Sequence, residues 1–224
     1  PRELAALAIT GGPRDVAVRG DVAYVVVQNR EAQPRMDVVD VADPARPRLI
    51  VSVPVAVVGS HARVIVAGER LVVLPTAGGI TVYDLANPRR PQEIGALALT
   101  DRPYGAAVSG NLLYVSDWRR GLYVLDPSGP GLPTIVGTRP GNDTSTDPEM
   151  LGTRPALACG GRMCAMAIAG VGVELVDVLE PTTPAAIGGI VPTPGDALSL
   201  AFLGTRLLVA DGGGGLMLDT LERP

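Results

Sequence analysis

The chain has 224 residues, of which 46% are hydrophobic and only 3% aromatic, and its formal net charge is −4 at pH 7. This length is sufficient for one large domain, whose core must consist mainly of Val, Leu, Ile and Ala. No apolar run reaches the 18 or more residues of a membrane-spanning helix, and no basic run indicates nucleic-acid binding. We therefore expect no membrane insertion by this chain and no nucleic-acid partner.

A repeating unit runs through the sequence. An Asp ends an apolar run in each of five units, and four of these Asp residues are followed by Pro at +4 and +7. A Gly marks a second equivalent position in every unit. The two sets are Asp40, Asp84, Asp126, Asp177 and Asp219, and Gly20, Gly68, Gly110, Gly161 and Gly204. A fixed phase of this kind is typical of repeat architectures.

The first unit predicts four short strands, at residues 15–19, 22–28, 36–41 and 49–55. The first two flank Gly20-Asp21, a two-residue hairpin turn in which Gly tolerates positive φ. No segment of the chain has convincing helical periodicity. Each unit is therefore expected to be a four-stranded antiparallel sheet.

The Asp–Pro–Pro pattern is interpreted as a capped turn. The carboxylate of an Asp such as Asp40 can accept hydrogen bonds from backbone N–H groups just ahead, and the prolines end the strand pairing. A metal-ligand role for these Asp residues is disfavoured, and we expect no metal site and no cofactor.

Short strands with a period near 45 residues predict an all-β fold, a five-bladed β-propeller of four-stranded antiparallel blades in a single domain over residues 1–224. Central strands that are apolar on both faces suit blades packed between two neighbours. The expected blades are residues 15–55, 63–99, 105–138, 156–190, and 198–219 together with 3–9.

The last of these blades rests on a split repeat. Residues 1–10 (PRELAALAIT) resemble residues 91–100 (PQEIGALALT), which follow the third strand of their unit. The unit that should precede residue 1 lies at the far end of the chain. We therefore predict that residues 3–9 pair with residues 214–219 and close the ring, with Leu4 near Leu216.

The third strands and the hairpins resemble the signature of LVIVD-repeat propellers. The segments that carry the resemblance are MDVVDVADP (36–44), ITVYDLANP (80–88), LYVLD (122–126), VELVDVLEP (173–181), DVAVRGDVAYV (15–25) and AAVSGNLLYVSD (106–117). The resemblance implies a propeller of the kind found in secreted or surface-exposed bacterial proteins, with no catalytic residues defined by the repeat. The sequence departs from the pattern at LACGGRMCAMA (157–167) and in the long segment 138–155.

The two cysteines become informative once they are placed on the repeat. Gly161-Arg162 aligns with the turn pair Gly20-Asp21, so Cys159 and Cys164 face each other across a hairpin as a non-hydrogen-bonded pair. A cross-hairpin disulfide is the favoured interpretation, and two free core thiols are the alternative. A disulfide would imply the periplasm, the cell surface or the exterior.

Candidate binding residues lie on the rim that carries the loops between second and third strands. Trp118 beside Arg119 and Arg120 has the composition of an interface hot spot. The other candidates around this rim are Tyr104, Arg102, His61, Arg63, Arg30, Arg139 and Arg154. The alternative is that Trp118 covers the channel mouth while the arginines are solvated.

The leading functional hypothesis is a non-enzymatic propeller that presents this rim to a protein partner in an envelope or extracellular assembly. We assign no catalytic residue, because no paired carboxylates, Ser–His arrangement or metal cluster is recognisable. The alternatives are a small-ligand or carbohydrate binder or a hydrolase that uses the channel mouth, and a purely architectural module of a longer surface protein. A repeated lectin site is disfavoured, because no aromatic residue occupies the position of Trp118 in the other units.

Overall fold

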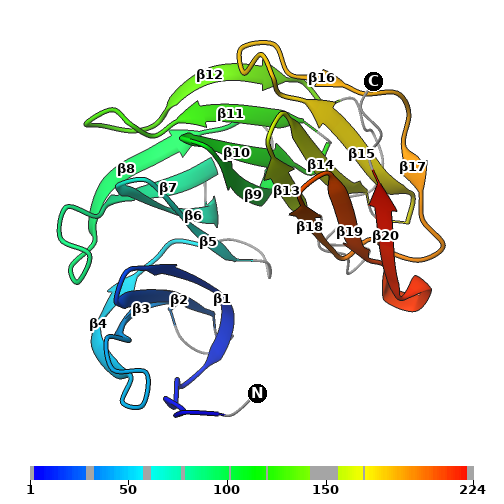
Figure 1. Cartoon of the computed structure of the whole chain (residues 1–224). Helices are drawn as coiled ribbons and strands as arrows, with labels where there is room; N and C mark the ends of the chain where they lie inside the picture. The colour runs from blue at the N-terminus through cyan, green and yellow to red at the C-terminus, as the bar shows by residue number, and fades with distance from the viewer. Residues whose placement is uncertain are drawn as a thin grey trace. The chain divides into compact units, whose positions relative to one another are not determined.

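The computed structural model describes residues 3–28, 33–57, 62–76, 79–100, 102–119, 121–141, 156–168 and 170–220. Its strands form five antiparallel sheets, here named A to E in chain order (Figure 1). The chain divides into two compact units, unit 1 (Pro1–Thr100 with Pro130–Leu132) and unit 2 (Asp101–Gly129 with Pro133–Pro224). No helix among the described residues is long and apolar enough to cross a membrane.

Unit 1 contains sheets A and B, in each of which four strands lie in sequence order. Sheet A consists of β1 (Gly12–Arg19), β2 (Val22–Gln28), β3 (Arg35–Asp40) and β4 (Arg48–Pro54). Sheet B consists of β5 (Arg63–Ala67), β6 (Arg70–Thr76), β7 (Gly79–Asp84) and β8 (Gln92–Ala98). The two sheets share a core that includes Tyr24, Met36, Leu71 and Tyr83. Their second and third strands are buried on both faces, as the sequence predicts.

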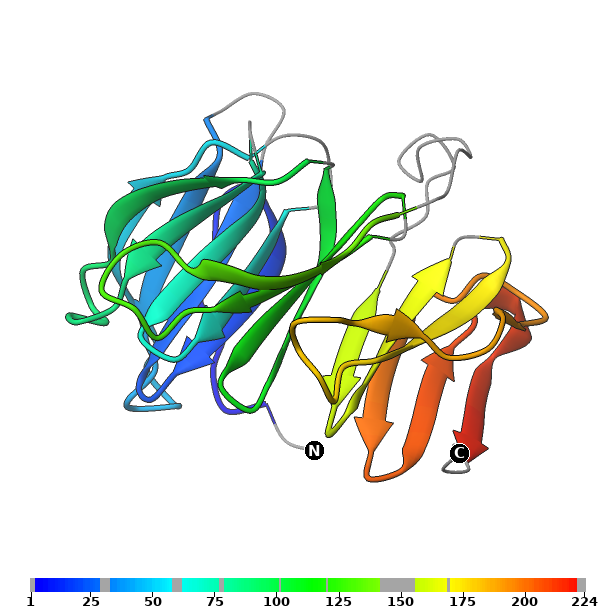
Figure 2. The ribbon, with the colours of Figure 1, turned by 90° about the horizontal axis from the view of Figure 1, so that it is seen from above.

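Unit 2 contains sheets C, D and E (Figure 2). Sheet C consists of β9 (Pro103–Ser109), β10 (Leu112–Asp117), β11 (Leu122–Asp126) and β12 (Thr134–Arg139). Sheet D consists of β13 (Leu157–Gly160), β14 (Met163–Ile168), β15 (Gly172–Asp177), β16 (Ala185–Ala186) and β17 (Val191–Pro192), and sheet E of β18 (Ser199–Leu203), β19 (Arg206–Ala210) and β20 (Leu216–Thr220). Both β16 and β17 pair with β15, so the fourth strand of sheet D is split in two. Cores between C and D and between D and E hold the unit together.

The predicted hairpin turns are present in all five sheets. The turn glycines Gly20, Gly68, Gly110, Gly161 and Gly204 have φ between 56° and 62°, the left-handed region that favours glycine. In each case the residues on either side of the two-residue turn pair directly, as Gly160 does with Met163.

The Asp turns are also formed as predicted in sheets A to D. The Oδ1 atoms of Asp40, Asp84, Asp126 and Asp177 each accept a hydrogen bond from the backbone N–H two residues ahead, at 2.8 to 3.3 Å. Asp40 also joins sheet A to sheet B, because it accepts hydrogen bonds from both Arg48 and Arg89.

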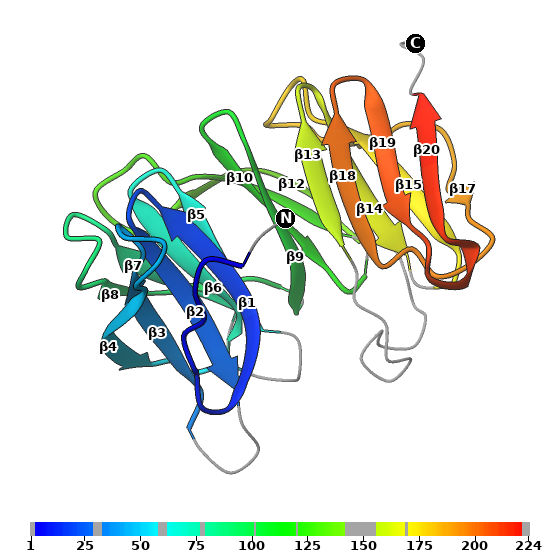
Figure 3. The ribbon, with the colours of Figure 1, turned by 60° about the horizontal axis from the view of Figure 1, so that its bottom comes forward.

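The predicted closure by the N-terminal strand is wrong for this structure. Residues 3–9 form no strand, as Figure 3 shows beside β1, and β20 pairs with β19 alone among the described strands. Sheet E therefore has three strands, and Leu4 and Leu216 are 65% and 72% exposed. The similarity of residues 3–9 to β8 indicates a local preference for strand. However, β8 is stabilised by backbone hydrogen bonds to β7, and residues 3–9 have no such partner among the described residues of unit 1. The structure shows five antiparallel sheets, and residues 3–9 do not complete the last of them.

Candidate functional site

The loop that carries Trp118 is held rigidly at the end of β10. The buried carboxylate of Asp117 accepts hydrogen bonds from the backbone N–H groups of Arg119 and Gly121, at 2.8 and 2.7 Å. The N–H of Asp117 donates to the carbonyl of Gly121, and the N–H of Trp118 donates to the carbonyl of Arg102, at 3.0 and 3.1 Å. A Cβ at position 121 would lie 2.1 Å from Oδ2 of Asp117, so only glycine fits there.

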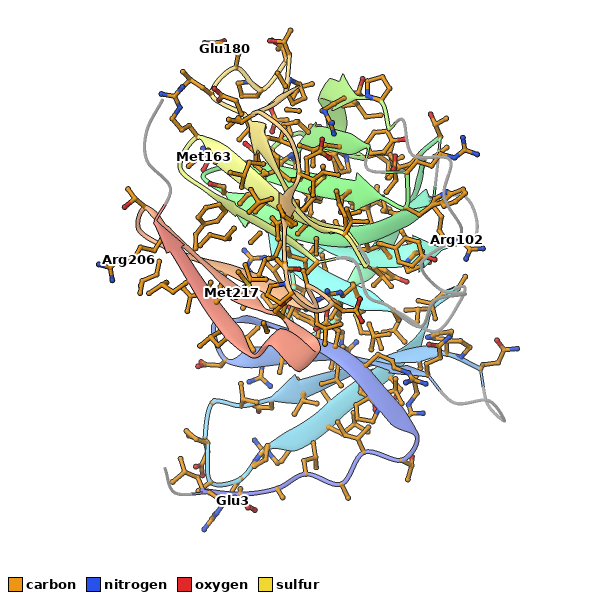
Figure 4. The ribbon with its side chains drawn as sticks, turned by 90° about the vertical axis from the view of Figure 1, so that its right-hand side faces the viewer. Glu3, Arg102, Met163, Glu180, Arg206 and Met217 are labelled. Carbon is orange, nitrogen blue, oxygen red and sulfur yellow. A yellow bond between two sulfur atoms is a disulfide. The ribbon has the colours of Figure 1, made fainter. Side chains whose placement is uncertain are left out.

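The side chains that this loop presents are an aromatic ring and cations. The Trp118 residue is half-buried, and the guanidinium carbon of Arg119 lies 4.8 Å from the centroid of its ring. This is the distance of a cation–π contact, which orders both side chains. Arg119 and Arg102 are exposed beside it, and Figure 4 shows Arg102 at the edge of the molecule. We call Arg102, Trp118 and Arg119 the Trp118 surface.

Two of the predicted rim residues have largely buried side chains in unit 2. Tyr104 is only 3% exposed and belongs to the core. Arg139 in β12 pairs with Glu174 in β15, and their side chains are 14% and 10% exposed. Arg139 is turned inward by its ion pair with Glu174 of sheet D.

The other predicted rim residues cannot be joined to the Trp118 surface. Arg63 lies in β5 of unit 1, where it is half-buried. Arg30, His61, Arg120 and Arg154 lie outside the described residues.

The sequence analysis did not identify the buried aspartate that hydrogen-bonds to the backbone of the loop. Asp211, at the end of β19, is fully buried, and its N–H donates to the carbonyl of Gly215 as Asp117 does to Gly121. Its Oδ2 accepts a hydrogen bond from the N–H of Gly195 at 2.7 Å. The signal was present, because both Asp residues stand seven positions after a turn glycine and four before a glycine. The glycine run that follows Asp211 forms one turn of 3₁₀ helix over Gly212–Gly214.

The predicted disulfide is formed. Cys159 and Cys164 pair across the β13–β14 hairpin, with an S–S distance of 2.02 Å and Cα atoms 4.1 Å apart. Among the described residues, no group of three or more His, Cys, Asp and Glu side chains is placed to hold a metal ion.

Comparison with protein families identifies the repeat. Residues 10–55 and 105–139 match the model of the LVIVD repeat, and these segments comprise most of sheets A and C. The two matched segments carry LVIVD repeats. None of the curated proteins matches the chain.

β-Propeller proteins are among the solved structures similar to this chain. BamB from Moraxella catarrhalis is 13% identical, with a TM-score of 0.63 over 97% of this chain and 60% of BamB. The periplasmic gluconolactonase PpgL from Pseudomonas aeruginosa is 16% identical, with a TM-score of 0.72 over 94% of this chain and 66% of PpgL. A chain in the mitotic checkpoint complex is 13% identical, with a TM-score of 0.64 over 93% and 61% of the two chains. The chain thus spans less than two thirds of the length of each of these three proteins, and at these identities the likeness shows the propeller fold alone.

Proposed function

We propose that this protein is a non-enzymatic binding module that presents the Trp118 surface to a protein partner. The observation that carries the proposal is the loop itself, a half-exposed tryptophan stacked with an arginine on a backbone fixed by Asp117. Tryptophan and arginine are enriched in interface hot spots, and a preorganised loop loses little conformational entropy on binding. BamB and the chain of the mitotic checkpoint complex are propellers of the same fold, and the latter belongs to a protein assembly.

We place this module in the periplasm, at the cell surface or outside the cell. The disulfide between Cys159 and Cys164 supports an oxidising compartment, because cytosolic thiols are kept reduced. PpgL, a periplasmic protein, shows that the fold occurs in such a compartment.

The test is capture of partners from the native source by the full chain and by the variant Trp118→Ala/Arg119→Ala. Removing a hot-spot tryptophan and its neighbouring arginine is expected to lower the affinity by at least about 30-fold, equivalent to about 2 kcal/mol. Arg206→Ala, which removes an exposed arginine of sheet E, is the matched control. An unchanged set of partners with the double variant would reject the Trp118 surface and favour an architectural module.

The rival function is a small-ligand binder or a hydrolase, and the likeness to PpgL is the observation that favours it. Incubation of the chain with gluconolactone, with hydrolysis followed by the release of acid, tests this function directly. Turnover well above the uncatalysed rate would replace the binding-module proposal.

A further inference from the structure

A second surface of unit 2 lies at the opposite end of its strands from the Trp118 surface. A groove of about 860 Å³ opens where the hairpins of sheets D and E meet the turn that follows β15. Figure 4 shows Met163 and Arg206 on the two neighbouring hairpins. The apolar side chains that line the groove are Tyr114, Cys159, Met163, Val178, Leu179, Pro181 and Phe202. We call this the hairpin groove.

The lining of the hairpin groove suits a flat apolar group. Phe202 is the single phenylalanine of the chain, and its ring lies directly against the backbone of Gly160, where a Cβ would be 3.1 Å from the ring. Met163 pairs directly with Gly160 and lies on the same face of sheet D, whereas Cys159 and Cys164 face sheet C. Sulfur and aromatic groups make favourable contacts with aromatic rings. The volume is within the range of sites that hold small molecules.

The guanidinium of Arg162 lies at the groove and has N–H groups that can bind a ligand. The Arg162 side chain is 52% exposed, and within the part of the chain that the structure describes it donates one hydrogen bond, to Oδ2 of Asp177 at 3.2 Å. The other carboxylate oxygen of Asp177 accepts the N–H of Leu179, so this acid is engaged on both sides. A guanidinium has five N–H donors in a fork that suits a carboxylate, and four remain for a ligand.

From this combination we propose that the hairpin groove binds an aromatic carboxylate. Its ring lies against Phe202 and Met163, and its carboxylate is held by Arg162. This site is independent of the Trp118 surface, because the two lie at opposite ends of the strands.

The experiment uses the oxidised full chain, labelled with ¹³C in the methionine methyl groups and titrated with 2-naphthoate. The chain has five methionines, of which Met163 lines the groove and Met36 lies in the core of unit 1. The Met163 resonance is expected to shift saturably, with a dissociation constant on the order of 1 mM for a probe of this size, while Met36 does not move. The neutral isostere 2-naphthamide is expected to bind at least about fivefold more weakly, since it lacks the charge that Arg162 recognises.

Three variants locate the site and its charge. Arg162→Gln should abolish the preference for naphthoate over naphthamide, whereas the matched control Arg206→Gln should retain it. Thr205→Trp fills the groove and should prevent the shift with both probes. Leu179→Glu, at an exposed position of the groove, should weaken naphthoate alone and serves if the tryptophan variant does not fold.

A Met163 resonance that does not shift, or equal binding of the two probes, would overturn the proposal. So would a preference for naphthoate that survives in Arg162→Gln. Trp118→Ala/Arg119→Ala should leave the titration unchanged. Failure of the Trp118 surface to bind a partner therefore does not affect this result.

Discussion

The ion pair between Arg139 and Glu174 joins β12 to β15, and it is largely out of solvent. Glu174→Gln leaves the guanidinium buried without its carboxylate, and we expect the free energy of unfolding to fall by roughly 3 kcal/mol. Denaturation by guanidinium chloride measures the change. The double variant Arg139→Met/Glu174→Leu removes both charges and should recover most of the loss. A loss below about 0.5 kcal/mol in Glu174→Gln would contradict a structural role for the pair.

The disulfide between Cys159 and Cys164 also contributes to the free energy of unfolding. It closes a loop across only five positions, so the constraint on the unfolded chain is small. Reduction, or the variant Cys159→Ala/Cys164→Ala, is expected to lower the free energy of unfolding by about 2 kcal/mol without abolishing the fold. The check is urea denaturation with and without reductant, with thiols counted in parallel. Complete unfolding on reduction would show that the bond sustains the whole fold.

The turns and the disulfide could be predicted from the sequence, but the solvent exposure of individual side chains could not. Gly161 and Asp40 could be placed because a hairpin turn and a capped turn depend on neighbours within a few residues. The disulfide followed because the repeat fixed the register of its hairpin. The burial of Arg139 could not be predicted, because it depends on how sheet C packs against sheet D, which lies outside any local pattern.

Among the strands, those of sheet E stand out because they are apolar on both faces. Leu207, Val209 and Met217 pack toward sheet D, while Leu216 and Leu218 are exposed on the other face. An exposed apolar face next to an open strand edge favours association between molecules.

The variant Leu216→Lys/Leu218→Lys is expected to reduce concentration-dependent association, as followed by sedimentation or light scattering. The free energy of unfolding should change by no more than about 0.5 kcal/mol, because both side chains are on the surface. Met217→Lys, on the opposite face, is the control and should cost more than about 2 kcal/mol, because it places a charge against sheet D. Association that is unchanged in the double variant would show that this face is not the contact.

The positions of strands could be predicted because they depend on local sequence pattern. The pairing of residues 3–9 could not, because it depends on a strand edge far away in the sequence. The alternation of apolar residues and the turn glycine Gly20 locate β1 to β4 from local pattern alone. Residues 3–9 share the pattern of β8, yet they form no strand, since pairing requires a partner edge and not only a preference. The split of the fourth strand of sheet D into β16 and β17 was also missed, although Pro184, Gly188 and Gly189 lie beside or between the two pieces.

Across the whole molecule, the recurring Asp turns tie stability to pH. Hydrogen bonds from Arg89 and from the N–H of Ala42 lower the pKa of Asp40 from its usual 3.8 to about 2. Hydrogen bonds from Ser128 lower the pKa of Asp126, and the N–H of Leu179 lowers that of Asp177. Both units therefore hold carboxylates that are more acidic folded than unfolded.

A folded-state pKa below the unfolded value means that the unfolded chain binds more protons, so stability rises with pH in this window. The contribution is fully present above about pH 5 and is lost as the pH falls through 3.8 toward the folded pKa of Asp40, about 2. We expect the urea midpoint to be constant near neutrality and to decrease steadily between about pH 5 and pH 2. Asp40→Asn should lower the midpoint at pH 7 and flatten this decrease, because it removes one of the groups that titrate. Glu180→Gln, at an exposed position, is the control and should reproduce the parent profile. An acid limb of unchanged slope in Asp40→Asn would show that the turn carboxylates do not govern stability in acid.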